Sequence, residues 1–177
     1  MLNSSTAPEC ASLNIKWVTR PEWDARDPKK PLTPNINFKY LVVHHTSNIG
    51  TCISPDDCKL KARKVQDKHM DSRGFDDVGY NFFIDPFGSV LVGRGFDVEG
   101  GHTYRYNCDA YGVNFMGSFR TMNPTTLAIE AFNNLAIVKF MFSKEATKID
   151  KLTAKILSIF VAFSENVNFT TRQQADS

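Results

Sequence analysis

The feature that most constrains the fold is an uninterrupted apolar run ending in two histidines, Tyr40-Leu41-Val42-Val43-His44-His45-Thr46. A strand with consecutive apolar residues is buried on both faces, which is typical of a sheet covered by helices on each side. We therefore predict an α/β fold in which residues 40–46 form a central strand. Because neighbouring residues on a strand point to opposite faces, only one of His44 and His45 can face a given site.

A helix is predicted after this strand. Ser54 is a good N-cap residue, and Pro55 suits the first helical turn. The helix should run to about Ser72, with Gly74 available to end it. Its apolar face is formed by Cys58, Ala62, Val65 and His69, which recur at helical spacing. We therefore expect His69 to point inward.

The middle of the chain predicts an antiparallel hairpin, which makes the sheet mixed. Residues 80–84 and 89–92 flank the turn Asp85-Pro86-Phe87-Gly88, whose proline and glycine suit a type I geometry. Residues 111–117 predict a further strand. Asn123-Pro124 then supplies a cap and a first-turn proline for a helix over 124–142, and another helix is predicted over 144–163.

The remaining N-terminal segment, residues 1–37, is rich in proline and lacks a hydrophobic period. These properties predict an irregular arm that lies over the core, with Trp17 and Trp23 as its anchors.

Charge argues against two classes of partner. The net charge of +2 arises from 21 basic and 19 acidic residues spread along the chain, so neither a nucleic-acid stripe nor a polybasic membrane anchor is present. The most apolar late segment, residues 152–163, is about half as long as a membrane-spanning helix and contains Lys155. We expect no membrane span in this chain.

The four cysteines occur singly, without the Cys-x-x-Cys spacing of zinc or redox sites, at positions Cys10, Cys52, Cys58 and Cys108. An even number favours a disulfide-forming compartment. The alternative is four free thiols in a cytosolic protein, and it applies most to Cys10 and Cys108. The first residues lack the basic and apolar segments of a signal peptide. We expect an extracellular protein, either secreted or the ectodomain of a membrane receptor, with a cytoplasmic form as the alternative.

Several motifs occur together in a fixed order: residues 42–46, the pair Cys52 and Cys58, Asp77-Val78-Gly79-Tyr80-Asn81-Phe82, residues 93–96 and residues 101–107. Together they resemble the peptidoglycan recognition protein family, which is related to the type 2 N-acetylmuramoyl-L-alanine amidases. The resemblance covers about residues 15–135. It implies an N-terminal arm over 1–14, a recognition domain over 15–135 and an atypical, helical tail over 136–177.

The resemblance implies a central mixed sheet, three helices and an open groove for a muropeptide. In catalytic members a zinc ion is held by a histidine matching His44, by a second histidine and by a cysteine near the C-terminus. A tyrosine matching Tyr80 orients or activates the attacking water. Zinc needs three protein ligands and an open position to activate water. Here no histidine follows His102 and no cysteine follows Cys108, so we expect an incomplete metal site and a vestigial Tyr80.

The family groove assigns peptidoglycan contacts to His69, Gly74, Phe75, Tyr80, Arg94, His102, Thr103, Tyr104 and Asn107. At Gly74-Phe75 the small glycine leaves room for the extra carboxylate of diaminopimelate, which Arg94 or Arg105 could pair in a forked geometry. This favours diaminopimelate-type over lysine-type peptides. The alternatives are that Gly74 only ends the helix and that both arginines are solvated surface charges. Asn107 and Thr103 could likewise only satisfy the backbone of a glycine-rich turn. The resemblance also pairs Cys52 with Cys58 in a disulfide.

The function expected is peptidoglycan binding in innate immune recognition, without hydrolysis and without a cofactor. One alternative is a zinc-dependent amidase that cleaves the bond between muramic acid and L-alanine. A second is a regulatory module that pairs with a related receptor chain.

Overall fold

The computed structural model describes residues 14–141, which are organised around one five-stranded mixed sheet. The strand order is β1-β4-β3-β5-β2. The strands are β1 (Lys16–Val18), β2 (Tyr40–His45), β3 (Phe82–Ile84), β4 (Ser89–Val92) and β5 (Ala110–Phe115). The hairpin β3–β4 is antiparallel as predicted, and the other three pairings are parallel.

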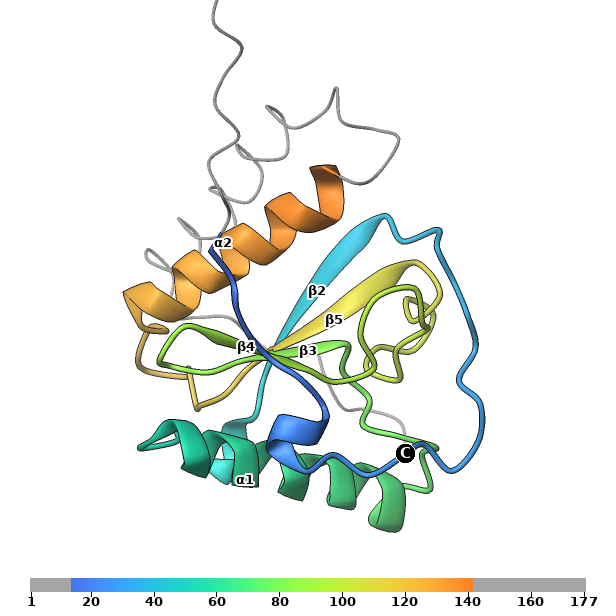
Figure 1. Cartoon of the computed structure of the whole chain (residues 1–177), viewed down its shortest axis with the longest axis horizontal. Helices are drawn as coiled ribbons and strands as arrows, with labels where there is room; N and C mark the ends of the chain where they lie inside the picture. The colour runs from blue at the N-terminus through green and yellow to red at the C-terminus, as the bar shows by residue number, and fades with distance from the viewer. Residues whose placement is uncertain (1–13, 142–177) are drawn as a thin grey trace, which may run out of the picture.

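Helices cover both faces of this sheet (Figure 1). Helix α1 (Pro55–Asp67) continues into a π-helical turn, η3 (Lys68–Ser72), and lies on one face, while α2 (Thr126–Met141) lies on the other. Two short 3₁₀ turns, η1 (Pro21–Trp23) and η2 (Ser47–Ile49), complete the described elements. The α/β prediction is confirmed. None of the helices in the described part is long and apolar enough to cross a membrane.

Each face has its own apolar core, because side chains alternate along the strands. The core beneath α1 contains Phe83, Leu91 and Cys58. The core beneath α2 contains Phe82, Val113 and Leu135. The predicted inward face of α1 is confirmed, because Cys58, Ala62, Val65 and His69 are all buried.

The prediction of a central β2 is wrong. Within residues 14–141, β2 lies at the sheet edge and pairs only with β5. Its residues are half-buried or exposed, whereas β5, which lies between β2 and β3, is buried throughout. An apolar run reports that both faces of a strand are covered, but it carries no information about how many neighbours the strand pairs with.

The arm is less irregular than predicted. Lys16–Val18 pairs in parallel with β4 as the opposite edge of the sheet. Trp23 is the expected anchor, since it is buried and its Nε1–H donates to the Val92 carbonyl over 2.9 Å. Trp17 is more exposed and packs its ring against Phe82 and Phe96 at the rim of the core. Three residues are too few to show an alternating pattern in the sequence.

The two helix starts have different outcomes. The Ser54 cap is confirmed, because its hydroxyl accepts a hydrogen bond from the Asp57 N–H. The cap of α2 is Thr125 rather than Asn123, since the Thr125 hydroxyl accepts from the Ala128 N–H and also donates to the Pro86 carbonyl. That second bond, to the β3–β4 turn, is a tertiary contact the local sequence does not reveal. The helix predicted over 144–163 lies outside the described residues, and α2 runs across the predicted boundary at 135/136.

Candidate functional site

The register of β2 and β5 determines which histidine faces the site. His44 pairs with Asn114, which in turn pairs with Phe83, so His44 lies on the α1 face of the sheet. His45 points to the α2 face, where its Nδ1 accepts a hydrogen bond from the Phe119 N–H over 3.2 Å. The prediction that the two histidines diverge is confirmed.

Three polar atoms meet beside His44. Its Nε2 lies 3.2 Å from Nδ1 of His102 and 3.3 Å from Oγ1 of Thr103. The third side of this triangle, from His102 Nδ1 to Thr103 Oγ1, is 3.0 Å. His102 and Thr103 follow His44 by 58 and 59 positions in the sequence, and the fold brings both into direct contact with it.

The loop that carries His102 is held in place by hydrogen bonds from its own backbone N–H groups. Asn107 accepts hydrogen bonds from the N–H groups of His102 and Thr103 through one amide oxygen, each over 2.8 Å. His102 Nε2 lies 3.1 Å from the Ala110 carbonyl, so it must carry a proton and donate. The ring lies directly over Gly112, where an added Cβ would come within 2.3 Å of it. The Asn107 amide oxygen therefore has the backbone-satisfying role that the sequence left open.

Tyr80 and His69 extend the group. The Tyr80 ring lies 5.2 Å from the His44 ring and 5.5 Å from that of His69, measured between centroids. His69 Nδ1 accepts the Gly79 N–H over 2.9 Å, and its ring also contacts Phe75. We call His44, His69, Tyr80, His102 and Thr103 the histidine cluster.

Burial keeps the cluster uncharged at neutral pH. Desolvation, reinforced by the neighbouring histidines, lowers the pKa of His44 to about 3. Desolvation likewise lowers the pKa of His69 and of His102 to about 4. Burial raises the pKa of the Tyr80 hydroxyl. All three imidazoles are therefore neutral and Tyr80 is protonated, so the cluster presents hydrogen-bond donors and acceptors rather than charge.

Asn114 belongs beside this cluster and was missed from the sequence. It is wholly buried on the same strand face as His44, and its amide lies close enough to Tyr80 to lower the pKa of that hydroxyl. The available signal was a polar residue inside the otherwise apolar strand 110–115, because a buried amide needs a reason to be there.

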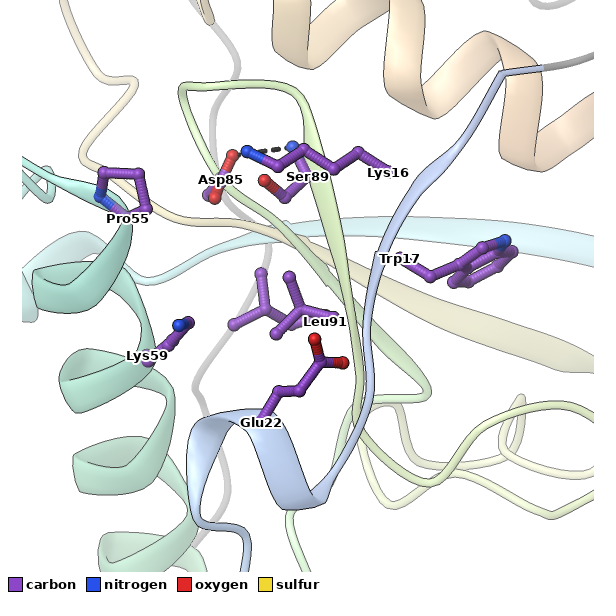
Figure 2. A pocket seen from close by; sticks show the side chains of 9 residues that line it. Lys16, Trp17, Glu22, Pro55, Lys59, Asp85, Ser89 and Leu91 are labelled. Atoms are coloured by element: carbon purple, nitrogen blue, oxygen red, sulfur yellow. Dashed lines mark hydrogen bonds between the residues drawn. The ribbon is translucent and has the colours of Figure 1, made fainter.

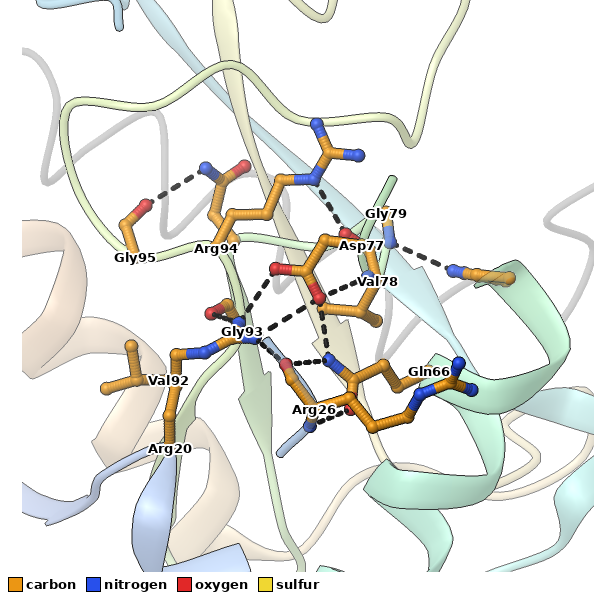
Figure 3. A network of polar contacts seen from close by, with 12 residues as sticks. Arg20, Arg26, Gln66, Asp77, Val78, Gly79, Val92, Gly93, Arg94 and Gly95 are labelled. Atoms are coloured by element: carbon orange, nitrogen blue, oxygen red, sulfur yellow. Dashed lines mark hydrogen bonds and ion pairs between the residues drawn. The ribbon is translucent and has the colours of Figure 1, made fainter. Parts of the chain in front are cut away.

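A buried polar network fixes the segment leading into Tyr80 (Figure 3). The Asp77 carboxylate accepts hydrogen bonds from Arg20 over 2.9 Å, from Gln66 over 2.7 Å and from the Val78 N–H over 2.7 Å. Gly79 must be glycine, because a Cβ there would lie 2.4 Å from the Gly101 carbonyl oxygen. The network thus ties the arm, α1 and the Gly79-Tyr80 segment together.

Arg94 is committed to the protein backbone. Its Nε donates to the Val78 carbonyl and its Nη1 to the Glu99 carbonyl, each over 2.7 Å. These bonds hold two loops together and leave Nη2 as the nitrogen not engaged in them. A fork through Nε and Nη2 would have to replace the bond to Val78, whereas Nη2 and the second N–H of Nη1 are not engaged in these two bonds.

The other predicted contact residues lie at the surface. Gly74 is exposed and has φ +71°, as expected of a glycine that ends a helix. Tyr104 is 84% exposed, and the Arg105 guanidinium stacks over its ring at 5.5 Å. The ligand roles of Gly74 and Tyr104 stay predictions.

The Cys52–Cys58 disulfide is confirmed. Both cysteines are buried in the core beneath α1, and the bridge fastens the loop after β2 to the first turn of that helix. Cys108 is an exposed free thiol, and Cys10 lies outside the described residues.

The donor set does not fit the zinc site of catalytic relatives. His44 matches one ligand, but the 177 residues contain no histidine after His102 and no cysteine after Cys108. Over residues 14–141, no three histidine, cysteine or acidic side chains are grouped so that they could hold a metal. The later two ligands therefore have no counterpart in this sequence.

A separate pocket lies at the opposite edge of the sheet, where β1 and β4 meet the start of α1 (Figure 2). It is lined by Lys16, Trp17, Val18, Glu22, Pro55, Lys59, Asp85, Ser89 and Leu91. The lining contains none of the residues predicted for the site, and β3 and β5 lie between β4 and β2 in the sheet.

Comparison with known proteins agrees with this geometry. Residues 34–147 match the family model described as N-acetylmuramoyl-L-alanine amidase. The chain is 35% identical over 136 residues to peptidoglycan recognition protein 1 of Bos indicus, covering 76% of this chain and 69% of that protein. It spans 34% of the length of peptidoglycan recognition protein 3 of Homo sapiens and 51% of the length of peptidoglycan-recognition protein LB of Drosophila melanogaster.

Solved structures of peptidoglycan recognition proteins have a similar fold. The ectodomain complex of peptidoglycan recognition proteins LCa and LCx with tracheal cytotoxin matches with a TM-score of 0.70 and 34% identity, covering 73% of this chain and 78% of that one. Peptidoglycan recognition protein LE, in complex with a monomeric diaminopimelic acid-type peptidoglycan, matches with a TM-score of 0.65 and 32% identity, covering 67% and 69%. The chain therefore belongs to the peptidoglycan recognition protein family, with an amidase-like domain.

Proposed function

We propose that this protein binds muropeptides of bacterial peptidoglycan in innate immune recognition and does not hydrolyse them. The observation that carries the proposal is that one part of the family site is present and the other part is missing. One sheet face assembles the side chains of His44, Tyr80, His102 and Thr103. The histidine and cysteine that would complete a hydrolytic zinc site have no counterpart after position 108.

The chemistry of the cluster suits recognition of the neutral, hydrogen-bonding groups of such a ligand. Neutral imidazoles, a phenol and a hydroxyl can donate to and accept from amide and sugar groups without the cost of desolvating a charge. Tyr104 lies on the loop that carries His102 and is largely exposed, so its ring offers an aromatic face to a ligand. Relatives of similar structure are solved with tracheal cytotoxin or diaminopimelic acid-type peptidoglycan bound, which supports the same ligand class here.

Calorimetric titration with defined diaminopimelate-type and lysine-type muropeptides tests the proposal. We expect saturable 1:1 binding, with a preference for the diaminopimelate type. Replacing Tyr104 by alanine should weaken binding by about 1–2 kcal/mol, or roughly tenfold, if the ring is buried by the ligand. The matched control is Phe87→Ala, which removes an exposed aromatic from the β3–β4 turn. Equal losses in both variants, or no heat with either muropeptide, would reject the proposal.

A digest separates recognition from the amidase alternative. The protein is incubated with a muropeptide and excess zinc, and the products are separated by chromatography. We expect intact ligand. Free stem peptide, lost in a Tyr80→Phe variant, would establish hydrolysis and overturn this part of the proposal.

The second candidate is a regulatory module that pairs with a related receptor chain. The observation that favours it is the similarity to the LCa–LCx ectodomain complex. Sedimentation of this chain with a related receptor ectodomain, with and without muropeptide, tests it. A complex that forms without ligand, together with silent muropeptide calorimetry, would favour pairing over recognition.

An extracellular location accompanies the proposal. The Cys52–Cys58 disulfide and the ectodomain relatives support it. Non-reducing mass spectrometry of protein recovered from the medium of expressing cells should show this bridge, whereas protein found only in the cytoplasm with both thiols free would contradict it.

A further inference from the structure

Asn114 is a polar side chain in the core whose presence the packing does not explain. It is wholly buried in β5, on the sheet face that carries His44. Within residues 14–141, neither its amide oxygen nor its amide nitrogen has a hydrogen-bond partner of good geometry. A buried amide without partners costs free energy, and an apolar side chain of the same shape would be equally stable or more stable. The stability of the core therefore gives no reason for an amide here.

The ring of Tyr80 lies over Asn114. In the sheet, Asn114 pairs with His44 on one side and with Phe83 on the other. The centroid of the Tyr80 ring is 5.2 Å from that of His44 and 5.6 Å from that of Phe83. A ring that contacts both flanking side chains on one sheet face covers the residue between them. The Asn114 amide is therefore enclosed between the sheet and Tyr80.

The hydroxyl of Tyr80 is a polar group within reach of this amide. Burial raises the pKa of the hydroxyl, and Arg73 and the Asn114 amide partly oppose that rise. A neighbour that lowers the pKa of an acid stabilises its anion, and among the two amide groups only the N–H donor can do so. The amide nitrogen therefore faces the phenolic oxygen, in a contact that is close but lacks the alignment of a full hydrogen bond.

We propose that Asn114 is a positioning residue for Tyr80 in muropeptide binding. Its Nδ2–H donates to the phenolic oxygen, so the hydroxyl hydrogen turns away from the sheet and donates to a carbonyl oxygen of the ligand. Accepting one hydrogen bond also strengthens the hydroxyl as a donor, because linked hydrogen bonds polarise one another. Tyr80 is half-buried, so a ligand can reach it. This inference rests on the proposed function, because it names how one group of that site is aimed.

The direction of the bond decides what Tyr80 recognises. If the amide oxygen faced Tyr80, the hydroxyl would donate to Asn114 and could only accept from a ligand. With the amide nitrogen facing it, the hydroxyl donates outward and the matching ligand group is an acceptor. The amide carbonyls of a peptide stem are acceptors of this kind. Asn114 thereby selects for a ligand carbonyl at this point of the site.

An NMR comparison tests the contact without a ligand. The side-chain amide signals of Asn114 are assigned by triple-resonance spectroscopy and followed in Tyr80→Phe, which removes the hydroxyl and keeps the ring. We expect these signals to shift clearly. The matched control is Tyr40→Phe, which removes a hydroxyl from an exposed tyrosine on β2 and should leave them in place. Unmoved signals in Tyr80→Phe, or equal movement in Tyr40→Phe, would overturn the proposal.

A double-mutant cycle on muropeptide affinity tests the positioning role. Tyr80→Phe and the nearly isosteric Asn114→Leu should each weaken binding by about three- to tenfold, the equivalent of one ordinary hydrogen bond. The double variant should bind no more weakly than Tyr80→Phe alone, because Asn114 acts only through the hydroxyl. A merely structural effect of Asn114 would instead make the two losses add, and additive losses would overturn the proposal.

Asn114→Asp tests the direction of the bond. A carboxylate can only accept, so the Tyr80 hydroxyl would donate to it and be lost to the ligand. The loss of affinity should be at least as large as in Asn114→Leu, and binding as tight as that of the parent would overturn the proposal. Circular dichroism melting confirms that each variant is folded before titration. If the parent chain itself binds no muropeptide, the proposed function is rejected, and the NMR comparison still decides whether Asn114 and Tyr80 are bonded.

Discussion

The buried His69 predicts a specific dependence of stability on pH. Its pKa falls from 6.5 to about 4 on folding, chiefly through desolvation. The unfolded chain therefore binds the proton more readily than the native one. The stability contributed by neutral His69 is complete above pH 6.5 and is lost as the pH falls toward and through 4.

The size of the effect follows from the two pKa values. Between pH 7.5 and pH 5 the difference in proton binding removes about 2 kcal/mol of unfolding free energy, and about 3 kcal/mol by pH 3. His69 is 6% exposed, so screening by solvent reduces this little. The structural cause is direct, because protonating Nδ1 breaks the hydrogen bond from the Gly79 N–H.

His69→Asn isolates this contribution. The asparagine oxygen can take the place of Nδ1 as the acceptor for Gly79, but it does not titrate. Urea unfolding followed by fluorescence of the buried Trp23 should show that the variant loses about 2 kcal/mol less than the parent chain between pH 7.5 and pH 5. His45→Asn, at a more open position, should change the profile less. Parallel profiles for His69→Asn and the parent would refute the reasoning.

Three further predictions concern the framework of the site. Asp77→Asn should lower the unfolding free energy by about 2–4 kcal/mol in urea titration, because it leaves Arg20 without its buried partner; a loss below that of the surface variant Asp56→Asn would contradict the role of the network. Gly112→Ala should displace the His102 ring, which would change the NMR shift of this histidine, and should weaken muropeptide binding. Gly74→Ala is the control and should leave the His102 shift unchanged. Replacing Cys52 and Cys58 together by serine should cost about 2 kcal/mol of stability through the entropy of a short loop, with Cys108→Ser neutral in the same melt.

The sequence predicted the parts of the fold that depend on local patterns. The α1 face at Cys58, Ala62 and Val65 and the β3–β4 hairpin follow from periodicity and turn residues, and both are confirmed. The edge position of β2 and the strand at Lys16–Val18 were not predicted. Both depend on which strand lies next to which, and that is decided by long-range packing.

The site likewise has residues that could be predicted from local motifs and contacts that could not. His44, Tyr80, His102 and Thr103 were identified from their motifs, and the structure brings them together. Arg94 bonds the carbonyls of Val78 and Glu99, a structural role that the sequence did not predict, and its pairing with a ligand stays a prediction. Nothing in the sequence distinguishes an arginine that binds a ligand from one that joins two loops, since both occupy polar, glycine-rich segments.

The π-helical turn at Lys68–Ser72 has a consequence for how this site tolerates length changes. Its wider turn accommodates one residue more than a regular α-helix would, and the Arg73 N–H reaches back to the Lys68 carbonyl. Deleting one residue here would restore regular helical geometry and leave the chain after the turn close to its present orientation, because the π turn already absorbs the extra residue. The same deletion in the regular part of α1 would instead rotate everything downstream by about 100° around the helix axis. The turn is therefore the place in this helix where the loss of one residue least disturbs the contacts of Phe75 with His69 and of Asp77 with Arg20.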